Sequence, residues 1–152
     1  MKLDLFGGIE IDESELIIFE EGILGFEDNH KYILMNQKAV EEPIPFKWLQ
    51  AIDDENVGFM VAYPYLLLEE YDFELDDEIV KELEIENSEE IVIYNIVTVG
   101  KNFAGSTVNL KAPLVINSRT RKGKQVVLAD DRWPLKYAFV AEMKKRLEEE
   151  KK

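Results

Sequence analysis

Apolar and polar positions alternate along the chain in short runs that end at turn-forming residues. Alternation with a period of two is typical of strands, and short strands at this regular spacing are typical of a barrel or sandwich. The predicted strands cover residues 15–19, 31–35, 46–52, 57–61, 90–100, 107–110, 113–117 and 124–128. The run at 90–100 is nearly continuous in apolar residues, so we predict that it is central and buried on both faces.

Two segments depart from the strand pattern and have the spacing of helices. Asp76 can cap a helix whose first turn is acidic and whose apolar residues share one face, which predicts a short helix near residues 76–84. Near the C-terminus, Asp131 and Pro134 have the chemistry of a helix entry, and later apolar residues fall at helical spacing. We therefore predict a mainly β, single-domain antiparallel β-barrel-like fold over residues 1–152, with this short helix and a C-terminal helix.

Composition supports a globular protein. The chain has 152 residues, of which 46% are hydrophobic and 33% charged, enough to bury a core. It has no cysteine, which excludes disulfides, thiolate metal sites and cysteine nucleophiles. The N-terminus has no signal-peptide pattern, and the longest nearly uncharged run, residues 57–68, is too short to span a bilayer. Together these features predict a cytoplasmic protein that does not insert into a membrane.

Negative charge is concentrated in the first part of the chain. Residues 1–110 hold 6 Lys or Arg and 26 Asp or Glu, a balance of 6 − 26 = −20. Residues 111–152 hold 12 and 6, a balance of 12 − 6 = +6. An acidic body of this kind repels nucleic acid and attracts basic protein partners. The simpler interpretation is that the excess charge only keeps the protein soluble.

Candidate catalytic groups are sparse. The single histidine, His30, lies in a polar turn, and the chain has no nucleophile elbow, phosphate-binding glycine loop or metal-ligand spacing. Acidic pairs such as Asp53 with Asp54 and Asp130 with Asp131 are interpreted as turn residues. We therefore predict no enzyme activity, no metal and no cofactor. The alternative is an enzyme built from carboxylates that converge from distant strands.

Basic residues cluster at two places. One is the predicted hairpin connection at 118–123 with its flanking strand, and the other is the predicted C-terminal helix. The residues concerned are Arg119, Arg121, Lys122 and Lys124 in the hairpin and Lys144, Lys145 and Arg146 in the helix. Neither cluster carries the interleaved aromatic residues of a base-stacking surface, so we predict no direct binding of nucleic acid.

An apolar and aromatic stretch, residues 63–71, lies next to acidic residues and has the composition of a protein contact. Buried, the same stretch would be an ordinary strand or helical turn. The predicted partner-binding residues are Glu69, Glu70, Asp72, Glu74, Tyr65 and Tyr71. Of the two tryptophans, Trp48 alternates within a strand and is predicted to be in the core, whereas Trp133 is either a hydrophobic staple or a contact residue.

Four segments, in order, resemble those of one known family. They are Gly22-Ile23-Leu24-Gly25-Phe26-Glu27, Pro45-Phe46-Lys47-Trp48-Leu49-Gln50-Ala51, Phe59-Met60-Val61-Ala62-Tyr63-Pro64, and Asn109-Leu110-Lys111-Ala112-Pro113-Leu114-Val115-Ile116-Asn117 followed by Gly123-Lys124-Gln125-Val126-Val127-Leu128. The chain resembles the flagellar assembly factor FliW family from about Phe19 to Trp133. Two departures, Tyr63 in place of a small polar residue and Trp133 in place of a common tyrosine, lie in candidate contact regions.

The resemblance implies a β-barrel-like fold and a regulator that binds proteins. Its implied partners are the RNA-binding translational repressor CsrA, whose repression of flagellin synthesis would be relieved, and flagellin as the competing partner. The motif residues are interpreted as structural: Pro45, Phe46, Trp48, Leu49, Gln50, Asn109, Ala112, Pro113, Asn117 and Gln125. A small-molecule-binding β-barrel is the second alternative, since closed barrels often hold a ligand.

Overall fold

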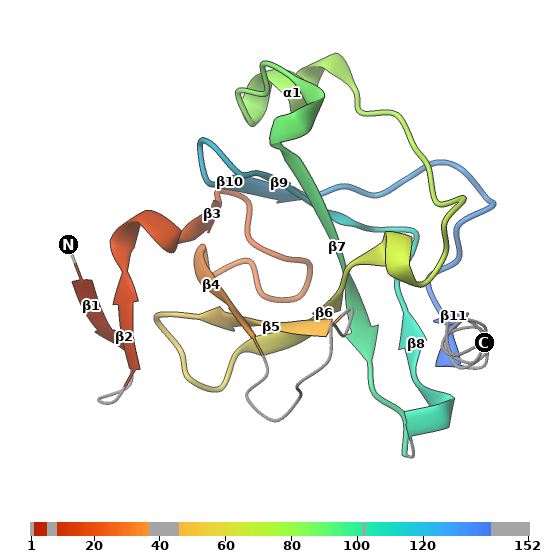
Figure 1. Ribbon diagram of the computed structural model, residues 1–152, viewed down its shortest axis with the longest axis horizontal. Coiled ribbons are helices and arrows are strands. Elements are labelled where there is room, and N and C mark those ends of the chain that lie inside the picture. The colour runs from red at the N-terminus through yellow and green to blue at the C-terminus, as the bar shows by residue number, and fades with distance from the viewer. Residues whose placement is uncertain (1, 6–8, 37–45, 102, 141–152) are drawn as a thin grey trace, which may run out of the picture.

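Seven strands close into a barrel in the computed structural model, which describes residues 2–5, 9–36, 46–101 and 103–140 (Figure 1). The barrel strands are β3 (Ile17–Phe19), β4 (Lys31–Asn36), β5 (Phe46–Ala51), β6 (Gly58–Ala62), β7 (Ile91–Thr98), β9 (Leu114–Asn117) and β10 (Lys122–Gln125). Each pairs with its neighbour in the order β7-β6-β5-β4-β3-β10-β9, and β9 returns to β7. The predicted mainly β, barrel-like class is therefore confirmed.

Strand pairing in the barrel is antiparallel except between the early strand β3 and the late strand β10. There β3 and β10 run parallel, with Ile18 opposite Lys122 and Phe19 opposite Gly123. A Cβ atom at Gly123 would lie 2.7 Å from the Phe19 ring. Because Phe19 is fully buried, its ring has no room to move away. Only glycine at position 123 lets β10 approach β3 this closely.

The central strand is β7, as its apolar run predicts. It pairs with β6, β9 and the short β8 (Thr107–Val108), which in turn pairs with β11 (Tyr137–Ala138). Tyr94 points into the barrel, while Ile93 and Val97 pack on its outer face, so both faces of the strand are buried.

The barrel interior is filled by side chains. Its buried members are Ile17, Phe19, Ile23, Tyr32, Leu49, Ala51, Val57, Val61, Tyr94, Leu114 and Ile116. Phe19 and Tyr32 meet edge to face, with ring centroids 5.5 Å apart. Burial, with a smaller effect of the Asp53 charge, raises the pKa of Tyr32 to about 12.

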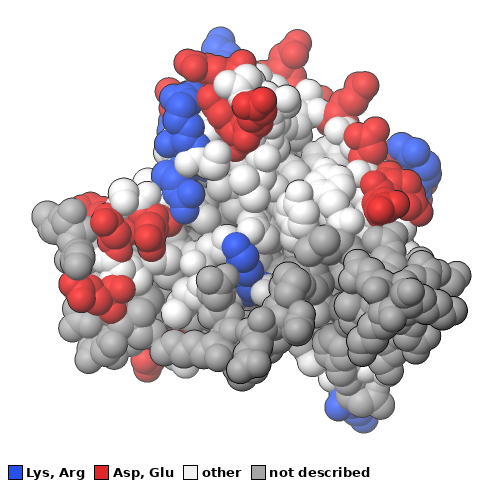
Figure 2. Space-filling view, in the orientation of Figure 1, with Lys and Arg blue, Asp and Glu red and all other residues white. Residues whose placement is uncertain are grey.

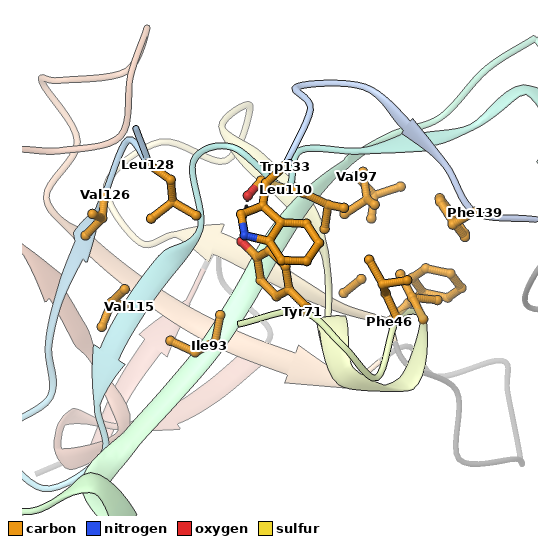
Figure 3. Packing of buried hydrophobic residues seen from close by; sticks show 14 of the residues in the cluster. Phe46, Tyr71, Ile93, Val97, Leu110, Val115, Val126, Leu128, Trp133 and Phe139 are labelled. Atoms are coloured by element: carbon orange, nitrogen blue, oxygen red, sulfur yellow. Dashed lines mark hydrogen bonds between the residues drawn. The ribbon is translucent and has the colours of Figure 1, made fainter. Parts of the chain in front are cut away.

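A second hydrophobic layer covers the outside of β6, β7 and β9 (Figure 3). It is supplied by the connection between β6 and β7 and by the chain after β10. Tyr71 and Trp133 lie at its centre, edge to face, with ring centroids 4.9 Å apart. The Trp133 indole N–H donates to the Asp72 carbonyl at 3.0 Å, so Trp133 staples the C-terminal segment to this layer.

The short helix is confirmed as α1 (Asp77–Glu82), whereas the predicted helix entry at Asp131 is wrong. Residues 131–136 form turns and bends, and the chain then pairs as a strand, with Tyr137 opposite Val108. Pairing with β8 satisfies backbone groups that a helix would have bonded internally. The rest of the predicted C-terminal helix, with Lys144, Lys145 and Arg146, lies outside the described residues, as does Pro45.

The remaining elements are short. They are the 3₁₀ helices η1 (Glu13–Glu15), η2 (Pro64–Leu66), η3 (Ser88–Glu90) and η4 (Phe103–Gly105), and a separate hairpin of β1 (Lys2–Leu5) and β2 (Ile9–Asp12). The apolar pattern did not predict that hairpin, which lies beside the barrel (Figure 1). Among the described residues no helix is both long and apolar enough to cross a membrane.

Candidate protein-contact surface

The motif around β5 is structural. Gln50 accepts a hydrogen bond from the Trp48 indole N–H at 2.8 Å and donates to the Val57 carbonyl at 2.9 Å. Its side chain thus ties the turn between β5 and β6 to the strand. Trp48 itself is half-buried above Gly58 on the outer face of β5, so the prediction that it lies in the core is not met. Phe46 and Leu49 are buried.

The second motif holds backbone turns together. The Asn109 side-chain oxygen accepts a hydrogen bond from the Ala112 N–H at 3.0 Å. The backbone carbonyl of Asn109 accepts one from the Asn95 side chain at 2.8 Å. Ala112 and Pro113 are buried beside this turn. Gln125 accepts from the Leu24 N–H at 2.9 Å, which fixes the glycine-rich loop at the end of the barrel. Most of the motif residues are therefore buried or hydrogen-bonded within the fold.

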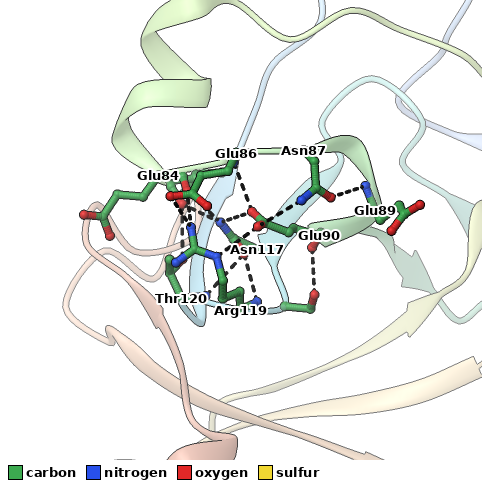
Figure 4. A network of polar contacts seen from close by, with 10 residues as sticks. Glu84, Glu86, Asn87, Glu89, Glu90, Asn117, Arg119 and Thr120 are labelled. Atoms are coloured by element: carbon green, nitrogen blue, oxygen red, sulfur yellow. Dashed lines mark hydrogen bonds and ion pairs between the residues drawn. The ribbon is translucent and has the colours of Figure 1, made fainter.

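A polar network, which we call the clasp, joins residues 82–90 to the turn after β9 (Figure 4). Asn117 is fully buried and donates to the Leu83 carbonyl at 2.8 Å. Its oxygen accepts from the backbone N–H groups of Arg119 at 2.8 Å and Thr120 at 3.2 Å. Arg119 donates to the buried Glu90 carboxylate at 2.9 Å. A buried polar network this well satisfied fixes one arrangement of its parts.

The clasp also pairs three of the four cations of the basic hairpin with carboxylates. Lys124 contacts Glu21 and Glu82, each at 2.9 Å, and Lys122 lies 3.3 Å from Glu84. Hydrogen bonds from the Glu86 backbone and then from the Arg119 guanidinium lower the pKa of Glu90 below its usual value. Arg119, Lys122 and Lys124 are therefore paired with carboxylates within the molecule, whereas Arg121 donates to the Glu15 backbone carbonyl at 2.8 Å.

The acidic segment, which we define as residues 69–78, has the opposite character. It contains seven carboxylates and no Lys or Arg. Among the described residues, none of the seven carboxylates forms an ion pair with another described side chain. Within it, exposed Asp72, Glu74 and Asp76 alternate with the half-buried Phe73 and Leu75. This period of two places acids outward and apolar side chains toward the barrel.

A groove lies between this segment and β7. We call it the aromatic groove; it has a volume of about 360 Å³ and is lined by Tyr63, Tyr65, Phe73, Leu75, Val80, Ser88, Ile91 and Ile93. The rings of Tyr63 and Tyr65 meet edge to face at 5.4 Å. Burial raises the pKa of Tyr65, with smaller effects from Tyr63 and the Asp72 charge. In Figure 2, acidic side chains border an uncharged area below α1.

The predicted contact residues divide into two groups. Glu69, Glu70, Asp72 and Glu74 are exposed along one segment, and Tyr65 lines the groove beside them. Tyr71 does not belong with them, because it is buried in the outer layer and donates from its hydroxyl to the Leu110 carbonyl at 2.6 Å. The prediction missed the groove-lining Phe73, Leu75 and Ile91. The alternation of acids with apolar residues at 72–76 was the signal for two of them.

The described residues offer little support for the alternative functions. They contain no group of three or more His, Asp or Glu side chains that could hold a metal ion. Glu27 and Asp130 have lowered pKa values because backbone and side-chain groups in their own turns donate to them, which keeps them charged. The barrel interior, where a small ligand would bind, is occupied by packed aromatic and aliphatic side chains.

A closed barrel, an internal clasp and a groove bordered by acidic residues together define a small mainly β protein. The model of the FliW protein family matches residues 1–139. A flagellar assembly factor FliW from Thermoanaerobacter pseudethanolicus is 41% identical over 91% of both chains, and one from Syntrophus aciditrophicus is 44% identical over 87% of this chain and 82% of its own. The chain belongs to the FliW family.

A solved structure supports the same assignment at the level of the fold. A crystal structure of the flagellar assembly factor FliW aligns with a TM-score of 0.80 at 33% identity, covering 91% of this chain and 96% of that one. The resemblance read from the four sequence motifs is therefore confirmed.

Proposed function

We propose that this protein is a non-catalytic regulator of flagellar assembly that works by exchanging protein partners. It binds a CsrA-type RNA-binding repressor and thereby relieves repression of flagellin synthesis, and it binds flagellin as the competing partner. It acts in the cytoplasm as a single FliW-like domain over residues 1–152, without a cofactor. Family membership and the names of the curated relatives support the link to flagellar assembly.

The observation that carries this proposal is the acidic segment. Its carboxylates form no ion pairs with other described side chains, unlike Glu82 and Glu90 of the clasp. An RNA-binding repressor presents basic surfaces, and opposite charge speeds encounter and sets orientation. Once bound beside the RNA site, the same carboxylates would repel phosphate groups, because exposed charges act over about 8 Å at physiological salt.

The test is RNA binding by the repressor at about 150 mM salt, with and without a saturating amount of this protein. We expect the repressor to lose affinity for its RNA in the complex and to regain it when flagellin is added. A complex that binds RNA with undiminished affinity would exclude the antagonist mechanism.

A further inference from the structure

The aromatic groove is an apolar site beside the acidic segment. It is lined by Ile91 and Ile93 of β7 and by Phe73 and Leu75 of the connection that leads to α1. Tyr63, which remains 39% exposed, also lines it, beside the half-buried Tyr65. Its volume of about 360 Å³ falls at the lower end of the range for ligand sites, roughly 300–1,000 Å³.

The walls of the groove are held in place from behind. Phe73 packs against the buried Tyr71, with ring centroids 5.4 Å apart, and Tyr65 packs against the same ring at 6.1 Å. The Tyr71 hydroxyl is fixed by Leu110, and it accepts from the Asn95 side chain at 3.2 Å. A preformed apolar site of this kind needs little reorganisation to take up a side chain.

The rim selects the charge of the occupant. Asp72, Glu74 and Asp76 alternate with the lining residues Phe73 and Leu75, so the carboxylates stand directly beside the apolar wall. Such a rim repels nucleic acid and acidic peptides and attracts Lys and Arg. The groove is open to solvent along Tyr63, which suits one side chain of a larger partner more than an enclosed small molecule.

We infer that the aromatic groove is the anchor site for a basic protein segment that inserts one bulky apolar side chain, with flanking Lys or Arg residues on the acidic segment. This inference rests on the proposed function of binding a basic protein partner and assigns the central contact to this groove. The apolar side chain supplies affinity by leaving water, and the flanking charges supply rate and orientation.

The direct test uses the whole chain and a defined probe. The probe is a heptapeptide with one phenylalanine between two runs of three lysines, titrated while methyl NMR signals are followed. We expect saturable shifts of the Leu75, Val80, Ile91 and Ile93 methyls. The matched peptide with alanine at the centre should bind about tenfold more weakly, and one with glutamates for lysines should not bind. Equal binding of the first two peptides, or shifts elsewhere only, would overturn the inference.

Substitutions separate this inference from the proposed function. Tyr63→Arg places a cation at the groove mouth, while Val127→Arg places one at a 58% exposed apolar residue that does not line the groove. We expect only Tyr63→Arg to weaken the binding of both the peptide and the CsrA-type partner, by about tenfold. If both variants bind the partner like the wild type, the groove assignment fails and the proposed function stands. If the wild type binds no such partner, the proposed function fails, and the peptide titration decides the groove assignment alone.

Discussion

Two neighbouring acidic regions of this molecule carry the same residue types and have different physical roles. In the clasp, Glu82, Glu84 and Glu90 each meet a cation of the β9–β10 hairpin within 2.9–3.3 Å. In the acidic segment, the seven carboxylates form no ion pair with a described side chain, and Asp72, Glu74 and Asp76 border an apolar groove. The clasp carboxylates are paired with cations of the same protein, whereas the carboxylates of the acidic segment are exposed to solvent.

The difference shows that the number of acidic residues alone does not identify a contact surface. Clasp carboxylates gain hydrogen bonds and ion pairs on folding, so they favour the folded state. Carboxylates of the acidic segment repel one another at close spacing, and only Asp76, Asp77 and Glu78, at the start of α1, gain a favourable interaction with the helix dipole. Features that do not serve the stability of the fold are where a binding role is expected, and the unpaired carboxylates of the acidic segment are such a feature.

The largest expected effect comes from breaking the clasp at its buried centre. Asn117→Ala leaves the Leu83 carbonyl and the N–H groups of Arg119 and Thr120 without their partner. We expect a loss of about 2–4 kcal/mol in the free energy of unfolding, because buried polar groups left unpaired cost about 1–3 kcal/mol each. A thermal scan should show a Tm lower by about 5–15 °C.

Asn56→Ala is the matched control for this substitution, since Asn56 is exposed in the turn between β5 and β6. It should change stability by less than about 0.5 kcal/mol. Equal Tm values for the two variants would mean that the clasp does not hold the hairpin.

A smaller loss is expected when one cation of the clasp is removed. Lys124→Gln breaks contacts with Glu21 and Glu82 while leaving the strand intact. Exposed or half-exposed ion pairs contribute about 0–1 kcal/mol, and here two acids are left facing each other. Denaturant unfolding should show that the free energy of unfolding falls by about 1 kcal/mol, and by less at high salt. The control Lys101→Gln, at an exposed residue, should leave the free energy of unfolding unchanged.

The clasp should also make stability depend on acidity. The folded-state pKa of Glu90 is lowered from 4.5, so its charge stabilises the fold above pH 4.5. That contribution is lost as the pH falls below 4.5 through the lowered pKa. Between about pH 6 and 3, the free energy of unfolding should therefore depend less steeply on pH for Glu90→Gln than for the wild type. An unchanged slope would show that Glu90 does not contribute in this way.

The smallest change in stability is expected from the acidic segment. Replacing Asp72 and Asp76 with asparagine and Glu74 with glutamine should change the free energy of unfolding by no more than about 0.5 kcal/mol, or increase it slightly. The reason is that these exposed side chains lose mutual repulsion and no partner. A clear destabilisation in denaturant unfolding would mean that this segment resembles the clasp.

Local patterns in the sequence predicted the local structure well. The apolar run at 90–100 gave the central strand β7, and the acidic start near Asp76 gave α1. The parallel pairing of β3 with β10 could not be predicted, because it joins residues about a hundred positions apart and depends on space at Gly123. At the C-terminal side, pairing with β8 overrode the helix-entry chemistry of Asp131.

The candidate site was predicted only in part, for a related reason. The acids at 69–74 could be named from composition, because their exposure follows from their charge. Tyr71 and Trp48 were misplaced, since the side of an element that is covered depends on the outer layer and not on the element itself. The groove required β7 to meet the 73–75 segment, which no local pattern encodes.

The most direct test of the account compares two charge reversals of equal size. In one variant Glu69, Glu70 and Asp72 become lysine; in the control Glu13, Asp28 and Glu55, which are also exposed, become lysine. Both change the net charge from −14 to −14 + 6 = −8. Association with the CsrA-type repressor, followed by stopped flow at low salt, should slow about tenfold or more only for the first. Equal rates for the two variants would show that net charge, and not the acidic segment, directs the encounter.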